Sequence, residues 1–382
     1  MLDMSGMVSC CQHSTYWLRN EQGHMYTVKD NLSDVWNSKS RHDWVAALER
    51  GERVPECQEC WGKEDIGVES IRQYFNQHLS DVEPVATQPR IISIKPGIMC
   101  NNACRSCNEQ TSSMWFKDAY EFDRETHPDV PFKTWLQKWQ PHVTIYKDNA
   151  SLEQTFDAWQ EHMIFWDIYG GEPLTIPLSY RIIQGAADSG FASNQEIQIH
   201  TNGTVYDPAL AKMFEKFRSV IFAVSIDGIG AKNDYLRHGS EFDKVIANLT
   251  QYHNDLKSVK HVQLYVRCTP TPLNVYGIDE YCEYFDKTGI RYTINNYAVD
   301  EPHNNIQYMP ESIKQKVADK LQNVNHPQVD QLIRYMMGTP ADLAEKQLAF
   351  WKHNTKLDQI RKQSFADVFP EWHAVWQEYL AE

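Results

Sequence analysis

Between residues 90 and 300, short runs of β-branched and aromatic residues alternate with longer segments of helical hydrophobic spacing. This alternation is typical of repeated βα units, whose strands form a parallel sheet. The interval between the first two strands is longer than an ordinary crossover, so we expect an insertion with extra helices there. Six strands are predicted, at Ile91–Lys95, Ile164–Tyr169, Glu196–Thr201, Val220–Ile226, Val262–Thr269 and Tyr292–Asn295.

The segments on either side of this region have a different pattern. Over the first 80 residues the apolar spacing would bury little surface, and two helices are predicted there, at Ser33–Arg50 and Glu64–His78. A polar stretch, Ser80–Gln88, is predicted to be a linker, whereas the chain after residue 310 has helical spacing. We therefore expect three parts: a small N-terminal module at 1–80, an α/β core at 90–300 and a C-terminal helical extension at 301–382.

The formal net charge of -14 narrows the choice of partners. Affinity for nucleic acid depends on clustered Lys and Arg that release counterions, so we expect no nucleic-acid partner. The sequence has no run of 18 or more apolar residues, and its first residues, MLDMSGMVS, have neither a basic nor an apolar signal region. We expect a soluble, cytoplasmic protein without a membrane partner.

Three cysteines follow the first predicted strand on a single loop. Cys100, Cys104 and Cys107 have the spacing C-x3-C-x2-C. Three thiolates can hold a [4Fe-4S] cluster and leave the fourth iron open for a small chelating ligand. A zinc knuckle is the alternative, although zinc normally takes four ligands and no fourth is evident near the loop. Three incidental thiols in a turn are the second alternative.

Polar motifs at the ends of three later strands accompany the cysteine loop. Gly170-Gly171-Glu172-Pro173 ends the second strand, His200-Thr201-Asn202-Gly203 the third, and Ser225-Ile226-Asp227-Gly228 the fourth. Together with the cysteine loop, these segments resemble the radical S-adenosylmethionine superfamily. The resemblance implies an α/β fold with a partial (β/α)6 TIM-like barrel, a [4Fe-4S] cluster and S-adenosylmethionine as cofactors. Ser106 departs from the family pattern, which usually has an aromatic or large apolar residue before the third cysteine.

The resemblance also implies roles for the strand-end residues. The Gly170–Pro173 segment would approach the cofactor closely and meet its ammonium group through a carbonyl or the Glu172 carboxylate. Asn202, Ser225 and Asp227 would contact the ribose or the carboxylate of the cofactor. Arg237 would pair with a carboxylate. The alternatives are cap and turn roles for the polar residues and a solvated surface position for the arginine.

A second group of cysteines lies near the N-terminus. Cys10, Cys11, Cys57 and Cys60 stand in segments that resemble the twitch or SPASM-like module, which holds an auxiliary Fe-S cluster; here the module precedes the barrel. We expect three cysteine ligands and an iron that is open or completed by Cys11, by His13 or by another chain. A zinc site of all four cysteines is the alternative.

The expected function is reductive cleavage of S-adenosylmethionine to a 5'-deoxyadenosyl radical, followed by hydrogen-atom abstraction from a substrate. Relatives of this type often modify peptides, so a peptide or protein substrate is favoured over a small molecule, with flavodoxin or ferredoxin as the reducing partner. Cys268 on the fifth strand is a candidate hydrogen-atom donor, or else a buried inert thiol. A non-catalytic electron carrier or redox sensor and a zinc-stabilised binding module are the alternatives outside radical enzymes.

Overall fold

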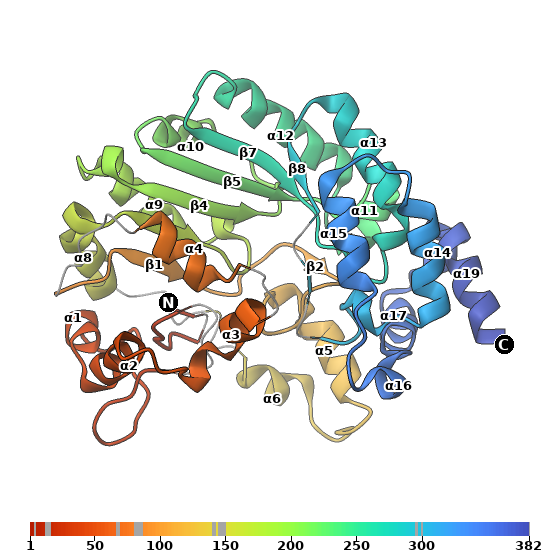
Figure 1. Ribbon diagram of the computed structural model, residues 1–382, viewed down its shortest axis with the longest axis horizontal. Helices are drawn as coiled ribbons and strands as arrows, with labels where there is room; N and C mark the ends of the chain where they lie inside the picture. The colour runs from red at the N-terminus through yellow and green to blue at the C-terminus, as the bar shows by residue number, and fades with distance from the viewer. Residues whose placement is uncertain are drawn as a thin grey trace. The chain divides into compact units, whose positions relative to one another are not determined.

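The computed structural model describes residues 1–3, 5–11, 17–65, 69–79, 87–139, 143, 150–294, 297–298 and 301–381. Its main element is a six-stranded sheet in the order β1-β3-β4-β5-β7-β8 (Figure 1). The strands are β1 Ile91–Ile94, β3 Phe165–Ile168, β4 Glu196–Thr201, β5 Ser219–Ser225, β7 Val262–Arg267 and β8 Tyr292–Thr293. All six predicted strands are confirmed; Asn295, the last residue of the final predicted strand, lies outside the described residues.

The sheet is parallel, and its strands follow one another in chain order. Ile91 pairs with Phe165, and Phe165 pairs with Glu196. Parallel neighbours need crossover connections, and the helical segments between the strands supply them. The sheet stays open, with β1 at one edge and β8 at the other. The predicted six-stranded βα architecture is therefore confirmed.

The sequence of each strand explains how it is buried. In β4 the exposure alternates residue by residue, with Ile197 and Ile199 fully buried, as the period of two in a strand requires. In β5 the run Phe222, Ala223 and Val224 is buried on both faces. Continuous apolar runs of this kind are typical of strands that helices cover on both sides.

Two compact units divide the chain. Unit 1 consists of Met1–Ile98, Gln140–Ile199 and Lys216–Val220. Unit 2 consists of Met99–Trp139, His200–Glu215 and Ile221–Glu382. These ranges cut the chain differently from the three predicted parts, which stay a prediction.

Unit 1 contains short helices around β1 and β3. They are α1 Leu32–Trp36, α2 Lys39–Glu49, α3 Gln58–Asp65, α4 Ile71–His78, α8 Ala150–Trp159 and α9 Pro177–Asp188, with 3-10 turns η1 Pro55–Cys57, η3 Gln160–His162, η4 Pro173–Thr175 and η5 Ala192–Asn194.

Two helix predictions in unit 1 were wrong in extent. The helix expected at Ser33–Arg50 is two helices, because the chain leaves helical geometry at Asn37 and Ser38, and its cap is Asn31, whose side chain accepts the N–H of Ser33. The helix expected at Glu64–His78 is likewise replaced by α3 and α4, with residues 66–68 outside the described ranges. The predicted linker is also largely outside them, at residues 80–86.

Unit 2 contains twelve of the described helices, a small antiparallel pair and the remaining 3-10 turns. The pair is β2 Ala103–Cys104 with β6 Arg237–His238. The helices are α5 Phe116–Asp123, α6 Phe132–Gln137, α10 Pro208–Phe214, α11 Ala231–Leu236, α12 Phe242–Leu256, α13 Ile278–Thr288, α14 Glu311–Leu321, α15 Pro327–Met336, α16 Leu343–Lys346, α17 Ala349–Arg361, α18 Phe365–Val368 and α19 Pro370–Ala381. The helical insertion and the helical C-terminal segment are both confirmed. No helix among the described residues has the length and apolar content needed to span a membrane.

Substitution of Gly203 should lower the free energy of unfolding strongly. Its φ is +75°, and an added Cβ would lie 2.7 Å from Val224 Cγ1 and 2.9 Å from Val245 Cγ1. Gly289 in the same unit has φ of +69° but open space around it, so it serves as a matched control. We expect Gly289→Ala to lower the free energy of unfolding by about 1 kcal/mol and Gly203→Ala by a further ~1–3 kcal/mol from crowding. Urea unfolding measures both, and equal losses would contradict the crowding.

Candidate functional site

The cysteine loop follows β1 in the chain and is held in unit 2 by a strand pairing. Cys104 lies in register with Arg237, and Arg105 donates its N–H to the carbonyl of Leu236 at 2.7 Å. Close approach at this pairing needs glycine at position 239, since a Cβ there would lie 3.0 Å from the carbonyl oxygen of Asn101. The backbone of the loop is therefore fixed before any metal binds.

Hydrogen bonds and a nearby cation act on the sulfur atoms of the loop. The Asn102 N–H donates to Cys100 Sγ at 3.4 Å. A hydrogen bond between the Cys104 and Cys107 thiols lowers the pKa of Cys107 and raises that of Cys104, while the nearby Arg237 guanidinium lowers the pKa of both. N–H groups and a cation beside sulfur favour the thiolate, which is the form that binds iron.

Asn102 adds an observation that the sequence did not predict. Its side chain is fully buried, and neither its Nδ2 nor its Oδ1 has a hydrogen-bond partner among the described residues. Buried amides are normally paired, so an orphaned one between Cys100 and Cys104 is typical of a site that takes a polar or inorganic group. The donor set and this amide both fit an Fe-S cluster.

Arg105, between the second and third cysteines, anchors the loop to α17. Its side chain is 2% exposed and forms an ion pair with Asp358, a hydrogen bond to Asn354 and a bond of 3.0 Å to Gln363 Oε1. The guanidinium also lies 3.6 Å from the ring centroid of Tyr235. Sequence reasoning missed this residue, because nothing in the motif indicates that its partners lie some 250 positions later.

Asn202 reaches the same loop from the end of β4. Its Nδ2 donates to Asn101 Oδ1 at 2.7 Å and lies 3.9 Å from Cys100 Sγ. Its Oδ1 accepts the N–H of Thr204 at 3.0 Å. The structure therefore brings Asn202 to the cysteines, and its predicted contact with the cofactor stays a prediction.

Asp227 and Arg237 form a buried ion pair. Arg237 Nη1 lies 2.6 Å from Asp227 Oδ2, with side-chain exposures of 11% and 6%. The other carboxylate oxygen of Asp227 accepts the N–H of Thr269 at 2.9 Å. The sequence predicted that both residues contact the cofactor. In the structure, the carboxylate of Asp227 holds the guanidinium of Arg237 in place.

Cys268 and Ser225 complete the predicted residues of unit 2. Cys268 is fully buried, its thiol accepts from Asn274 Nδ2 at 3.5 Å, and burial raises its pKa well above the usual range. Ser225 is the last residue of β5 and is partly exposed. These observations neither support nor contradict the predicted roles of Cys268 as a hydrogen-atom donor and of Ser225 as a cofactor contact.

The Gly170–Pro173 segment lies in unit 1, at the end of β3. Gly170 and Gly171 have φ of +87° and +51°, and a Cβ on Gly170 would lie 3.0 Å from the side chain of Lys95. Glu172 is fully buried, and its Oε1 accepts the N–H of Leu174 at 3.0 Å, which caps the turn η4. The glycines are required by the backbone, as the motif implies.

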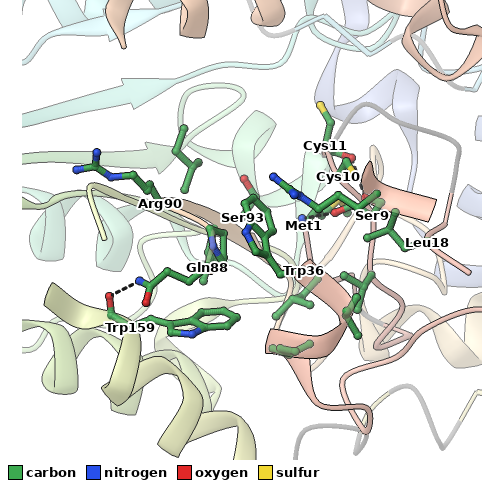
Figure 2. A pocket seen from close by; sticks show the side chains of 18 of the residues that line it. Met1, Ser9, Cys10, Cys11, Leu18, Trp36, Gln88, Arg90, Ser93 and Trp159 are labelled. Atoms are coloured by element: carbon green, nitrogen blue, oxygen red, sulfur yellow. Dashed lines mark hydrogen bonds between the residues drawn. The ribbon is translucent and has the colours of Figure 1, made fainter. Parts of the chain in front are cut away.

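The four N-terminal cysteines gather in unit 1. Cys10 interacts electrostatically with Cys11 and Cys57, and Cys57 interacts with Cys60 and Cys11. Burial raises the pKa of Cys10 and of Cys57 to about 11. Cys10 and Cys11 also line a cavity, which Figure 2 shows. His13, named as a possible further ligand, lies outside the described residues.

A second cavity, of about 390 Å³, lies in unit 2 beside Cys107. Two histidines of its lining, His303 and His353, stack with ring centroids 3.7 Å apart. Burial lowers the pKa of His303 to about 4 and that of His353 to about 3, so both rings are neutral at pH 7. The sequence showed no spacing that would have joined these two residues.

No three His, Cys, Asp or Glu side chains within the described ranges converge in a geometry suited to one metal ion. The ligands of a cluster differ from those of one ion, because each thiolate binds a separate iron.

No protein-family model and no curated protein matches this sequence. Comparison with solved structures finds radical S-adenosylmethionine enzymes. One is anSMEcpe with bound AdoMet, at 17% identity over 62% of this chain and 59% of that chain, with a TM-score of 0.41. Another is SuiB of Streptococcus suis bound to S-adenosylmethionine, at 12% identity over 85% of this chain and 68% of that chain, with a TM-score of 0.38.

A third is the same SuiB bound to precursor peptide SuiA, at 11% identity over 86% of this chain and 69% of that chain, with a TM-score of 0.37. This chain thus spans 59% of the length of anSMEcpe. Because these TM-scores all lie below 0.5, we base the proposed function on the residues of this chain.

Loss of Arg105 should destabilise unit 2 strongly. Arg105→Gln removes the buried cation and leaves Asp358, which is 14% exposed, without its ion-pair partner; breaking a buried pair typically costs about 3–5 kcal/mol. Lys287→Gln is the matched control, because Lys287 pairs with Glu283 at 2.5 Å but is 70% exposed, and such pairs contribute about 0–1 kcal/mol. Urea unfolding of the three chains gives the values. A loss below ~1 kcal/mol for Arg105→Gln would show that the ion pair does not anchor the loop.

Proposed function

We propose that this chain is a radical S-adenosylmethionine enzyme whose cluster is held by Cys100, Cys104 and Cys107. The single observation that supports this most is the loop itself: three cysteines in the C-x3-C-x2-C spacing, with an N–H donated to Cys100 Sγ and the Arg237 guanidinium interacting electrostatically with Cys104 and Cys107. When bound, a reduced [4Fe-4S] cluster supplies the electron that cleaves S-adenosylmethionine to a 5'-deoxyadenosyl radical.

The chain's own residues hold and orient these groups. Arg237 places a positive charge beside Cys104 and Cys107, and Asp227 fixes that charge through its ion pair. Asn202 fixes Asn101 next to the first cysteine. We assign cofactor binding to Asn202, Ser225 and Asp227 in unit 2, and to the Gly170–Pro173 segment in unit 1.

Two further assignments belong to the same proposal. Cys10, Cys11, Cys57 and Cys60 would hold an auxiliary Fe-S cluster, which their mutual proximity supports. The proposed substrate is a peptide or protein, from which a hydrogen atom is abstracted, and the electron donor is a flavodoxin or ferredoxin. Cys268 stays a predicted hydrogen-atom donor; its complete burial equally suits a packing role.

Cleavage of the cofactor is the decisive test. After anaerobic reconstitution with iron and sulfide, we expect dithionite and S-adenosylmethionine to give 5'-deoxyadenosine, measured by chromatography. Cys104→Ala should abolish it, because the cluster loses one of its three ligands. Cys282→Ala, which removes a buried thiol from α13, should retain it. A reducible cluster that yields no 5'-deoxyadenosine would instead identify an electron carrier.

Iron content tests the auxiliary site separately. Two cubane clusters correspond to about eight irons per chain, and one to about four. We expect about eight in the parent and about four in Cys57→Ala, with 5'-deoxyadenosine formation retained because the loop of unit 2 is intact. Cys282→Ala is again the control. Four irons in both chains, with one zinc in the parent alone, would identify the alternative zinc site.

A further inference from the structure

A cavity of about 450 Å³ lies in unit 1 along the outer edge of β1. We call it the β1-edge cavity. Its volume falls in the range of ligand-binding pockets. Figure 2 shows Arg90, Gln88 and Trp159 at one end and Ser9, Cys10 and Cys11 at the other, with Ser93 between them. Most of the remaining lining is apolar, including Leu18, Val35, Phe75 and Ile164.

The backbone of β1 has hydrogen-bonding groups that face this cavity. Ser93 O accepts the N–H of Leu2, and Lys95 donates its N–H to Leu2 O, so alternate residues of β1 direct their groups away from β3. By the same alternation, the N–H and C=O of Ile91 and the N–H of Ser93 face outward. No described segment of the chain bonds to them. An edge in this state can accept an added strand.

The charged side chains among the described lining residues are both basic. Arg41 and Arg90 line the cavity, and none of the described residues that line it is Asp or Glu, although acidic residues outnumber basic ones in the chain, 51 to 37. Within the described part of the chain, no carboxylate pairs with Arg41, whose guanidinium lies 3.6 Å from the ring centroid of Trp36. The Trp36 Nε1 is buried and also has no partner among the described residues. These donors favour an occupant with acceptor or anionic groups.

We propose that the β1-edge cavity binds an extended peptide segment that pairs with β1 at Ile91 and Ser93. The segment places an apolar side chain in the cavity and an acidic group near Arg41. This assignment rests on the proposed function, since it names the class of peptide that the enzyme takes. It also places the bound segment next to Cys10 and Cys11.

A binding measurement without S-adenosylmethionine or a reductant tests the assignment. The probe is a short fluorescent peptide, acetylated and amidated, in which Leu or Val alternates with Glu. We expect it to bind the reconstituted full chain, and a peptide with Lys in place of Glu to bind at least about tenfold more weakly. Two N-methylated versions of the Glu peptide are compared, one methylated at its odd-numbered backbone nitrogens and the other at its even-numbered ones. One version should lose binding and the other should keep it, because only every second N–H of the peptide faces β1.

Two controls make the outcome specific. Arg41→Gln should weaken binding of the Glu peptide about tenfold, which corresponds to ~1.4 kcal/mol, whereas Arg50→Gln should not, since Arg50 is exposed and paired with Glu52. If Arg41→Gln fails to fold, binding of the Glu, Lys and N-methylated peptides to the parent chain tests the assignment.

Equal binding of the Glu and Lys peptides, no effect of methylation in either register, or no binding at all would overturn the assignment. Decanoate binding as tightly as the peptide would overturn it in favour of a lipid-like ligand. Formation of 5'-deoxyadenosine is measured separately, so a failure of peptide binding and a failure of the radical-enzyme proposal are distinguishable.

Discussion

The buried side chain of Arg105 joins the cysteine loop to α17. A buried guanidinium is costly unless its N–H groups and its charge are all matched. Here Asp358, Asn354 and the ring of Tyr235 provide that match. Because the partners come from α11 and α17, the positions of Cys104 and Cys107 are coupled to the packing of the helices in the C-terminal part of unit 2.

Arg237 acts on the same cysteines from the other strand of the β2–β6 pair. It is fixed by Asp227, whose second oxygen is fixed by the backbone of Thr269. A cation held at this distance stabilises thiolates without being a ligand, and charges and hydrogen bonds near sulfur also set the reduction potential of a cluster. Asp227 and Arg237 therefore form one electrostatic unit beside Cys104 and Cys107.

The sequence predicted the elements whose signal is local. In β4, for example, buried and partly exposed residues alternate along the strand. The sequence did not predict the β2–β6 pair or the partners of Arg105, because both depend on residues more than 100 positions apart. The split between α1 and α2 was missed because the hydrophobic spacing continues through Asn37 and Ser38 while the backbone does not.

At the β1-edge cavity, the charged side chains of the described lining have the opposite sign to the net charge of the chain. The chain has a net charge of -14, yet the described residues that line the cavity include Arg41 and Arg90 and no acidic side chain. An open strand edge is an aggregation hazard when it is exposed, and proteins usually cover it. Here α1 and α4 enclose it instead of pairing with it, since Trp36 and Phe75 line the cavity. The proposed peptide would supply the missing strand partner of β1, and the basic residues of the lining would favour an acidic sequence over a basic one.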